Sequence, residues 1–489
     1  MRARQVIPSI PVAAVLQPAT PSSARPDIAV PPLDVARVAR TWWPLAASWL
    51  LMSAELPTIV AVVARLEDPE INLAAFGGVV FPLALIIESP VIMLLAASTA
   101  LCRDAAAYAT IRRYMMRAGA ALTALHLLLV LTPLYDVVVR GMIGAPEAVV
   151  EPARLGLMLM TPWTWAIAYR RFQQGVLIRY GRSRAVGLGT VARLAADVLV
   201  LGVGYAIGDL PGIAVGATAI SAGVLTEAAV SGWLVRPVRV GPLAARPAGP
   251  PVLLGPFMAF YIPLVLTSLV TLLAQPIGSA AMSRLPSPTA SLAAWPAIAG
   301  LSFVLRSAGM AFNEVMVALL DEPGARPALR RFAWLLAAGT TSVAVLFAAT
   351  PLADLWFGRI SALPPDLASM AKSGAWLIVP LAALVVVQSR FQGALLHGRR
   401  TRAITESVVL GLGVNGALLA LAVAAMRGQA AGGVLANAAE RAGLALSGDA
   451  ALSGLHVALW AMLASNVVQA AWLWWRGRGE LAVAETVTR

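Results

Sequence analysis

The stretch PTIVAVVARLEDPEINLAAF, residues 57–76, returns as PIGSAAMSRLPSPTASLAAW at residues 276–295. A shift of 219 residues places identical residues on one another: Pro44, Pro57, Arg65, Leu66 and Pro69 on Pro263, Pro276, Arg284, Leu285 and Pro288. The same shift carries Arg171-Phe172-Gln173 onto Arg390-Phe391-Gln392. Matches among Ala, Leu and Val carry little weight in so apolar a chain, but the Pro, Arg and Gln matches keep one register. The chain therefore consists of two copies of one unit, an arrangement that many membrane transporters share.

The composition is that of an integral membrane protein. Hydrophobic residues make up 59% of the 489 residues, charged residues only 12%, and the mean hydropathy is +0.79. A water-soluble domain carries about twice that share of charge. The net charge of +13 resides in short arginine clusters between apolar runs, which indicates membrane topology and not nucleic-acid binding. The single cysteine excludes an intrachain disulfide, and the three scattered histidines give no zinc-site spacing.

Apolar runs long enough to cross a bilayer number six in each copy. They are residues 42–64, 74–101, 117–138, 155–178, 186–207 and 211–235, then 256–282, 292–319, 332–354, 373–396, 403–426 and 453–475. Because six is even, both copies point the same way through the membrane. We predict an all-α polytopic membrane protein with 12 transmembrane helices in two parallel-repeat six-helix bundles around a central cavity.

Arginine clusters occur at every second connection, whereas the alternate connections are poor in arginine or balanced by acids. The positive-inside rule then predicts that both termini are cytoplasmic, in a bacterial cytoplasmic membrane. The expected domains are a disordered tail (1–40), an N-lobe (41–236), a linker (237–254), a C-lobe (255–476) and a second tail (477–489). Residues 427–449 are expected to form an external loop of unknown role.

Four acidic residues within the apolar spans are candidates for binding a coupling ion, because a charge in hydrocarbon is costly unless it faces a partner or a cavity. Glu55 stands two residues before Pro57, which bends the helix and frees carbonyl groups nearby. The other three are Glu88, Asp197 and Glu227. Simpler alternatives stay open, since Glu55 can be neutral or hydrated near the surface.

The second copy replaces two of these acids by amides. Gln275 stands beside Pro276 as Glu55 does near its proline, and Asn415 matches Asp197 with a one-residue gap. This difference indicates an ion site in the first half only. Asp197 also lies one helical turn after Arg193, so a simple intrahelical pair is the alternative to an ion site.

Arg306 and Asn313 share one face of the eighth span with Ser302 and Gly309, at helical spacing. Together with Gln275 and Asn415 they are the candidates for a substrate cavity. Arg306 either meets an anionic substrate or pairs with Glu88 or Glu314, and the sequence does not separate these roles.

Arg171, Gln173, Arg390 and Gln392 stand near the cytoplasmic ends of the fourth and tenth spans and are candidates for a cytoplasmic gate. The alternative is an anchor whose arginine reaches the membrane surface. No catalytic or metal-site motif occurs, so an enzyme is not expected. Coupling to H⁺ or Na⁺ is expected in place of any cofactor.

With twelve spans in two same-sense sixes, residues 41–476 resemble the MOP exporter superfamily. That group includes MATE drug exporters, lipid-linked oligosaccharide flippases and progressive-ankylosis (ANK) proteins. The stretch PGIAVGATA (residues 211–219) is similar to a Gly/Ala-rich stretch of that group, and WWPLA (42–46) and QPI (275–277) are similar to pieces of ANK proteins. The resemblance implies export by rocking of two lobes, with a first-half cation site on helices 1 and 5. Glu55 and Asp197 match that placement by helix.

The leading hypothesis is thus a MATE-like secondary transporter that exports a small organic solute in exchange for H⁺ or Na⁺. Because Arg306 would stand in the cavity wall, a flippase for lipid-linked precursors or an organic-anion exporter of the same fold is the alternative. A non-transporting scaffold and a membrane enzyme are less favoured. The expected partners are membrane lipids and the small-molecule or lipid-linked substrate, with no nucleic acid, and the chain is expected to be a monomer.

Overall fold

The computed structural model describes residues 32–482 apart from 248, 399 and 431–452, and across this described part the regular structure is helical, with no strand. Eleven of its helical segments are long and apolar enough to cross a membrane. The remaining predicted span is formed by α8 and α9, which carry Arg170 and Arg171 midway along the second piece. The predicted all-α polytopic fold is confirmed.

The first repeat contains six long helical passes, several of them broken into pieces. Its elements are α1 (Val35–Ser53), α2 (Glu55–Val63), α3 (Pro69–Leu73), η2 (Ala74–Val80), α4 (Phe81–Ile92), α5 (Leu94–Leu101), α6 (Ala105–Leu131), α7 (Leu134–Asp136), η3 (Val137–Ile143), α8 (Glu147–Leu159), α9 (Thr161–Arg179), α10 (Ser183–Ile207), α11 (Gly212–Leu234) and α12 (Arg236–Val240). The symbol η marks π-helical turns.

The second repeat has the same order of passes. Its elements are α13 (Leu254–Leu272), α14 (Ala274–Met282), α15 (Pro288–Leu319), α16 (Ala325–Ala349), α17 (Leu352–Asp354), η4 (Leu355–Ile360), α18 (Pro365–His397), α19 (Thr401–Ala430) and α21 (Gly454–Ala482). We call α2–α12 the N-terminal bundle and α14–α21 the C-terminal bundle.

Several helices begin earlier than the apolar runs do. The first starts at Val35, so residues 35–40 are not part of a disordered tail; Asp34 caps it by accepting the Arg37 N–H at 2.8 Å. The third starts at Ala105 and not at residue 117, because Asp104 accepts the Ala107 N–H at 2.9 Å. The arginines lie in these early turns, so a search for apolar runs alone leaves the turns out of the predicted spans. The ninth span likewise runs from Ala325 to Ala349 and not over 332–354.

The C-terminal ends also differ from expectation. α21 continues to Ala482, so the tail expected at 477–489 is helical over its first residues. The long loop expected at 427–449 begins later, because α19 runs to Ala430, and from residue 431 it lies outside the described part of the chain. Most of the expected N-terminal tail, residues 1–31, lies outside it as well.

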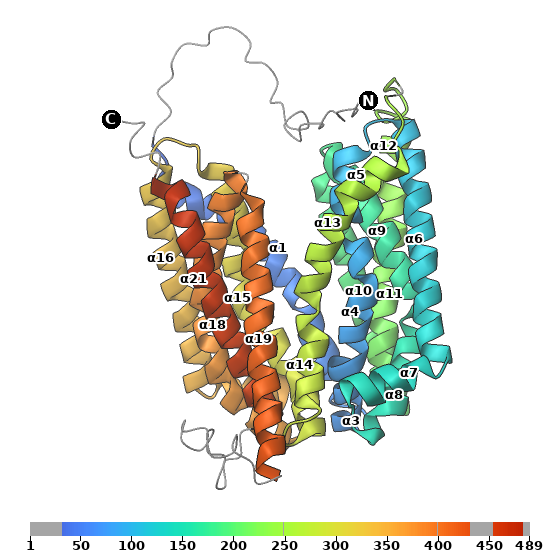
Figure 1. Cartoon of the computed structure of the whole chain (residues 1–489), viewed down its shortest axis with the longest axis vertical. Helices are drawn as coiled ribbons and strands as arrows, with labels where there is room; N and C mark the ends of the chain where they lie inside the picture. Colours follow the sequence, from blue (N-terminus) through green and yellow to red (C-terminus); the bar gives the residue numbers. More distant parts are fainter. Residues whose placement is uncertain (1–31, 248, 399, 431–452, 483–489) are drawn as a thin grey trace, which may run out of the picture.

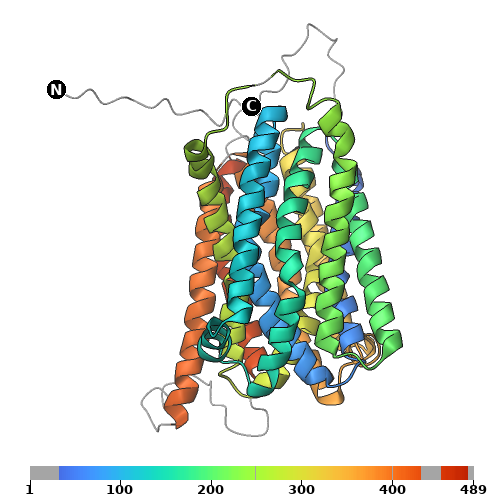
Figure 2. The same ribbon diagram turned by 90° about the vertical axis from the view of Figure 1, so that its right-hand side faces the viewer.

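The long helices run between two ends of the molecule (Figures 1 and 2). The connections at these two ends differ in their content of arginine. α1 begins and α21 ends at the top of Figure 1, where the arginine-rich connections lie. We call this the arginine-rich end. The short elements α3, α7 and α8 and the end of α14 lie at the opposite, arginine-poor end.

The first helix of each repeat crosses to the other bundle. α1 packs against α15 and α16, and the indole N–H of Trp42 donates to the carbonyl of Ala308 at 2.8 Å. Conversely α13 packs against α4, and the Tyr261 hydroxyl donates to the carbonyl of Pro90. Helix breaks at Ala54 and Leu273, 219 residues apart, separate these crossing pieces from α2 and α14. Each break lies three residues before a repeated proline, Pro57 or Pro276.

The bundles meet mainly at the arginine-poor end. Apart from α1 and α13, the main contacts between them join α2, α3, η2, η3 and α4 to α14 and α15. Gly77 lies so close to Pro296 that a Cβ atom there would be 2.5 Å from the proline Cγ, and a Cβ on Gly78 would be 2.8 Å from Leu292. These glycines permit the two backbones to approach.

Candidate functional site

Arg193 of α10 links three carboxylates from three helices. Its Nε donates to Glu55 Oε1 at 2.9 Å, and its guanidinium lies 3.7 Å from Glu227 and 4.0 Å from Asp197. Glu55 is the first residue of α2, directly after the break at Ala54, while Glu227 lies on α11. The predicted intrahelical pair with Asp197 is thus the longest of the three contacts. Three of the four acidic candidates meet at one guanidinium.

Glu227 is held from the other side by α9. Arg170 forms an ion pair with Glu227 Oε2, and the Gln174 amide donates to Glu227 Oε1 at 2.8 Å. The side chains of Arg170 and Glu227 are only 6% and 2% exposed. Sequence reasoning missed Arg170 and Gln174, because the repeat drew attention to the neighbouring residues 171–173. An arginine in the middle of a span was the signal that could have revealed the site.

Glu88 and Arg171 complete what we call the charge cluster of the N-terminal bundle. Glu88 is buried on α4, within electrostatic reach of Arg170, Arg171 and Arg193. The cluster contains four carboxylates (Glu55, Glu88, Asp197 and Glu227) and three guanidinium groups (Arg170, Arg171 and Arg193). With every group ionised it carries one unbalanced negative charge, which is costly in a low-dielectric interior.

Like Glu88, whose buried Oε2 has no hydrogen-bond partner among the described residues, Asp197 is poorly satisfied within the cluster. Neither of its buried carboxylate oxygens accepts a hydrogen bond within the described structure. The carboxylate lies against Gly223, where a Cβ atom would stand 1.8 Å from Oδ1. A proton on Asp197 would remove the unbalanced charge without needing space for a larger ligand. Among the described residues, no group of three or more His, Cys, Asp or Glu has metal-site geometry.

The C-terminal bundle has neutral side chains at the matching places. Asn415 is buried on α19, and Gln275 is half-buried on α14, which packs against α19. A Cβ on Gly411 would lie 2.3 Å from the amide nitrogen of Gln469, so an amide fills this space in place of a cation. The Gln388 amide donates to the Asn466 carbonyl at 3.0 Å. The two repeats therefore share a polar interior, but the second has amides where the first has Glu55 and Asp197.

Arg306 lies on α15, which packs against α1 and α18. It has no ion pair with Glu88 or Glu314, and its Nε has no hydrogen-bond partner in the described part of the chain. Glu314 accepts the indole N–H of Trp49 at 3.2 Å. Asn313 is turned toward α18, where its Oδ1 is 3.2 Å from the position of a Cβ on Gly393. The expected ion-pair alternative for Arg306 is therefore not formed.

The four gate candidates do not form one group. Arg171 belongs to the charge cluster, and Gln173 accepts the Tyr108 hydroxyl at 3.3 Å inside the N-terminal bundle. Arg390 lines a pocket at the arginine-rich end, and Gln392 is half-buried nearby on α18. No recorded contact joins the two sets across the bundles within the described residues. α9 extends to Arg179, so residues 171–173 lie about two turns inside the helix.

Two repeat-related arginines join the bundles at the arginine-poor end. Arg65 donates to the carbonyls of Ile360 at 2.9 Å and Arg359 at 2.6 Å, at the end of η4. Arg284 donates to the carbonyls of Ile143 at 2.6 Å, Met142 at 2.9 Å and Gly141 at 3.1 Å, at the end of η3. We call these reciprocal contacts the arginine latch. A Cβ on Gly144 would lie 3.1 Å from the Arg284 guanidinium.

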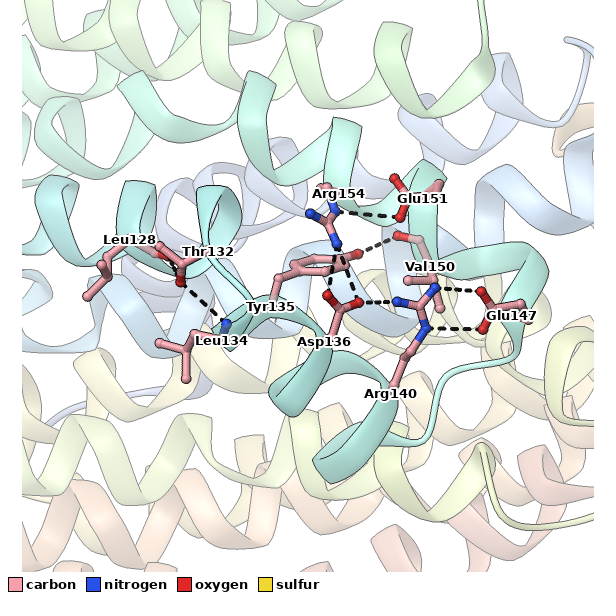
Figure 3. A network of polar contacts seen from close by, with 10 residues as sticks. All are labelled: Leu128, Thr132, Leu134, Tyr135, Asp136, Arg140, Glu147, Val150, Glu151 and Arg154. Atoms are coloured by element: carbon pink, nitrogen blue, oxygen red, sulfur yellow. Dashed lines mark hydrogen bonds and ion pairs between the residues drawn. The ribbon is translucent and has the colours of Figure 1, made fainter.

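An ion-pair network holds the η3 side of the latch in place (Figure 3). Arg140 lies between Asp136 and Glu147, with Nε 3.1 Å from Glu147. Arg154 reaches Asp136 at 3.3 Å and stacks over the Tyr135 ring. The second repeat contains a simpler form, in which Lys372 contacts Asp354 at 2.7 Å. The echo of TPLYD (132–136) in TPLAD (350–354) was the sequence signal for this pair of turns.

No family model and no curated protein matches the chain. Solved structures do match it over nearly its whole length. An inward-facing multidrug-resistance MATE family transporter of the MOP superfamily gives a TM-score of 0.59 at 15% identity, over 92% of this chain and 100% of that chain. An outward-facing MATE structure gives 0.53 at 16% identity, over 92% and 97%. A MOP superfamily transporter from Pyrococcus furiosus, described by the reverse polarity of its binding pocket, gives 0.55 at 17% identity, over 93% and 97%. These likenesses establish the MATE/MOP fold.

Proposed function

We propose that this chain is a proton-coupled secondary transporter that exports a small organic solute by alternating access. The observation that carries the proposal is the charge cluster, with one carboxylate more than its guanidinium groups can balance, beside amides at the matching places of the other repeat. Solved structures of this fold are transporters. A charge that changes with ion binding can shift a conformational equilibrium only if the two states differ in affinity for the ion.

The bend in the first helix gives the two conformations different affinities for the proton. Glu55 begins α2 directly after the break at Ala54, and Arg193 ties it to Asp197 and Glu227. Protonation of Asp197 weakens its attraction for Arg193 and leaves this guanidinium to Glu55 and Glu227. The balance of forces at the bend therefore depends on the proton. Because α1 packs against the C-terminal bundle, a change of bend moves the bundles relative to each other.

Charge and packing support an inward-open conformation, which suits export. The bundles are joined at the arginine-poor end, and the TM-score is higher for the inward-facing MATE structure than for the outward-facing one. With the arginine-rich end in the cytoplasm, as the positive-inside rule favours, this conformation receives solute from the cytoplasm. A proton is favoured over sodium because arginine donors, and not further oxygen ligands, surround the carboxylates.

Reconstitution into vesicles with an internal pH dye tests the proposal. We expect addition of a transported solute, found in a panel of organic cations and anions, to change the internal pH for the wild type. Asp197→Asn should abolish this change and keep the fold, because asparagine stands at the matching place of the other repeat. Asp209→Asn, at an exposed residue, is the matched control. Solute flux that follows a sodium gradient with no pH change would refute proton coupling.

The second candidate function is transport of a different substrate, an organic anion or a lipid-linked precursor. Arg306 favours it, because it is a largely buried arginine without an acidic partner in the described structure. Arg306→Gln should then abolish flux of anionic members of the panel and spare cationic ones. An equal loss of flux for anionic and cationic solutes would instead show that Arg306 has a structural role.

A further inference from the structure

Each repeat carries a pocket lined by arginines at the arginine-rich end. In the N-terminal bundle a pocket of about 450 Å³ lies between the first turns of α6 and the segment around α12. Arg112, Arg113 and Arg239 line it, together with the apolar residues Val240 and Leu243. Among its lining residues none is acidic.

The arginines of this pocket are not neutralised by neighbouring acids. The nearest acid in sequence, Asp104, accepts the N–H groups of Ala107 at 2.9 Å and Gly249 at 3.1 Å. Arg112 and Arg239 have no ion pair within the described residues, and Arg113 donates to the Thr110 hydroxyl. The Arg239 guanidinium lies over the Tyr108 ring, 5.5 Å from its centroid, which restricts its orientation.

The C-terminal bundle has a second pocket of about 210 Å³, lined by Arg326, Arg330 and Arg390. It lies between the first turns of α16 and the end of α21, where Arg326 donates to the Glu480 carbonyl at 3.2 Å. The acids nearby are engaged elsewhere. Asp321 contacts His397 at 2.8 Å, Glu322 contacts Arg37 at 2.8 Å, and Glu480 contacts Arg400 at 2.7 Å.

Both pockets lie at the arginine-rich end and include the first turns of the third pass of their repeat, but the second pocket also takes in residues of α15 and α18. A general excess of arginine on one side of a membrane explains basic loops. It does not explain a concave site with three arginines in each copy. Guanidinium groups in such a cluster suit the oxygens of a phosphate, which they bind by charge-assisted hydrogen bonds.

We propose that these pockets bind the phosphate headgroups of anionic phospholipids in the leaflet at the arginine-rich end. The apolar part of each pocket favours an amphiphile over a free anion. Val240 is 81% exposed beside Arg239 in the first pocket, and in the second pocket Leu320 is partly exposed whereas Met316 and Leu329 are buried. The headgroup contacts the arginines and an acyl chain covers the apolar side chains. This inference does not depend on the proposed transport.

Lipid binding to the full-length protein in zwitterionic nanodiscs tests the proposal. We expect phosphatidylglycerol to remain bound in native mass spectra and to raise the thermal midpoint, whereas phosphatidylcholine does neither. The double variant Arg112→Gln/Arg239→Gln should weaken phosphatidylglycerol binding at the first pocket about 10- to 30-fold, as the loss of two surface arginines implies, and leave binding at the second pocket unchanged. The matched control is Arg182→Gln/Arg184→Gln, at exposed arginines of the same end outside the pocket, which should bind as the wild type does.

Four outcomes would overturn the proposal. Equal loss in the control variant would mean that charge on this end acts without a specific pocket. The same thermal shift with inorganic phosphate alone would identify a site for soluble anions. Equal retention of phosphatidylcholine would show that the acyl chains, and not the headgroup, are recognised. A folded double variant that still binds phosphatidylglycerol with wild-type affinity also contradicts it.

Discussion

Arg170 lies in the middle of a membrane span and has its counter-charge on a neighbouring helix. Its ion pair with Glu227 is almost fully buried, with exposures of 6% and 2%. Removal of one partner from a buried pair leaves the other charge without compensation in a low dielectric. The energetics of the charge cluster therefore depend on single residues.

We expect Arg170→Gln to lower the free energy of unfolding by about 3–5 kcal/mol at neutral pH. The loss of stability should be smaller at acid pH, because protonation of the Glu227 carboxylate removes the charge that the variant leaves unpaired. Thermal melts in detergent between neutral and acid pH measure both effects. Arg182→Gln, at an exposed arginine, should leave the melts unchanged. A destabilisation of Arg170→Gln that is the same at every pH would contradict the charge argument.

Asp104 provides a second prediction at the scale of one residue. The Ala107 N–H holds the pKa of the Asp104 carboxyl below its usual range, with a further hydrogen bond from Gly249. Since the pKa is lower in the folded state than the unfolded value of about 3.9, this stabilisation is present above that pH and is lost as the pH falls through the folded-state pKa.

Asp104→Ala should therefore cost about 1 kcal/mol at neutral pH, as the loss of a helix cap does. The difference from wild type should decline in acid, which thermal melts along a pH series would show. Asp209→Ala, at an exposed aspartate, serves as the control. If the melting difference grew in acid, the sign of this linkage would be wrong.

At the scale of elements, the arginine latch joins η3 and η4 to the ends of α14 and α2. We expect Arg284→Gln to shift the population toward states in which the arginine-poor ends of the bundles separate. Spin labels at Glu67 and Asp366, exposed residues of the two bundles, report this distance once the single cysteine, Cys102, is replaced by alanine.

The control for the latch is Arg359→Gln. The Arg359 side chain is exposed, and only its backbone carbonyl takes part in the contact. For this control we expect unchanged distances between the spin labels. For Arg65→Gln, which changes the repeat partner of Arg284, we expect longer distances. Identical distance distributions in the wild type and both latch variants would mean that apolar packing alone joins the bundles.

The elements show how far the sequence determines the fold. Hydropathy and the repeat predicted the helical passes, because a helix in lipid must be both apolar and long. They did not predict the first turns at Val35 and Ala105, which depend on single capping aspartates. Nor did they show the crossing of α1 and α13, since the partners on which a helix packs are chosen in three dimensions.

The charge cluster was only partly predictable for a related reason. An acid in a span is visible in the sequence, and Glu55, Asp197 and Glu227 were identified in this way. Which cation meets which acid depends on helix rotation, so the central place of Arg193 and the role of Arg170 emerged only in the structure. The neutral amides of the second repeat were foreseen at Gln275 and Asn415.

For the whole molecule, the breaks at Ala54 and Leu273 are the places where the two bundles are coupled. On the N-terminal side of each break, the first helix of a repeat packs on the other bundle. We expect Pro57→Ala/Pro276→Ala to restore backbone hydrogen bonds, straighten both helices and slow exchange between conformations. Single-molecule fluorescence transfer between the bundles measures this rate.

A matched control for the hinge variant is Pro44→Ala/Pro263→Ala. These prolines also obey the repeat and lie within α1 and α13, away from the breaks. Their replacement should leave the exchange rate near that of the wild type. If the control slowed exchange as much as Pro57→Ala/Pro276→Ala does, the hinge would not lie at the breaks.

The reciprocity of the latch has a consequence for the origin of the chain. Each repeat supplies both a guanidinium and a carbonyl cradle, so a protein with a single repeat would already hold both halves of the contact. Two such protomers, pointing the same way, would associate side by side through one self-complementary interface, as a twofold dimer does. Fusion of the genes would then let one repeat carry Gln275 and Asn415 while the other kept Glu55 and Asp197.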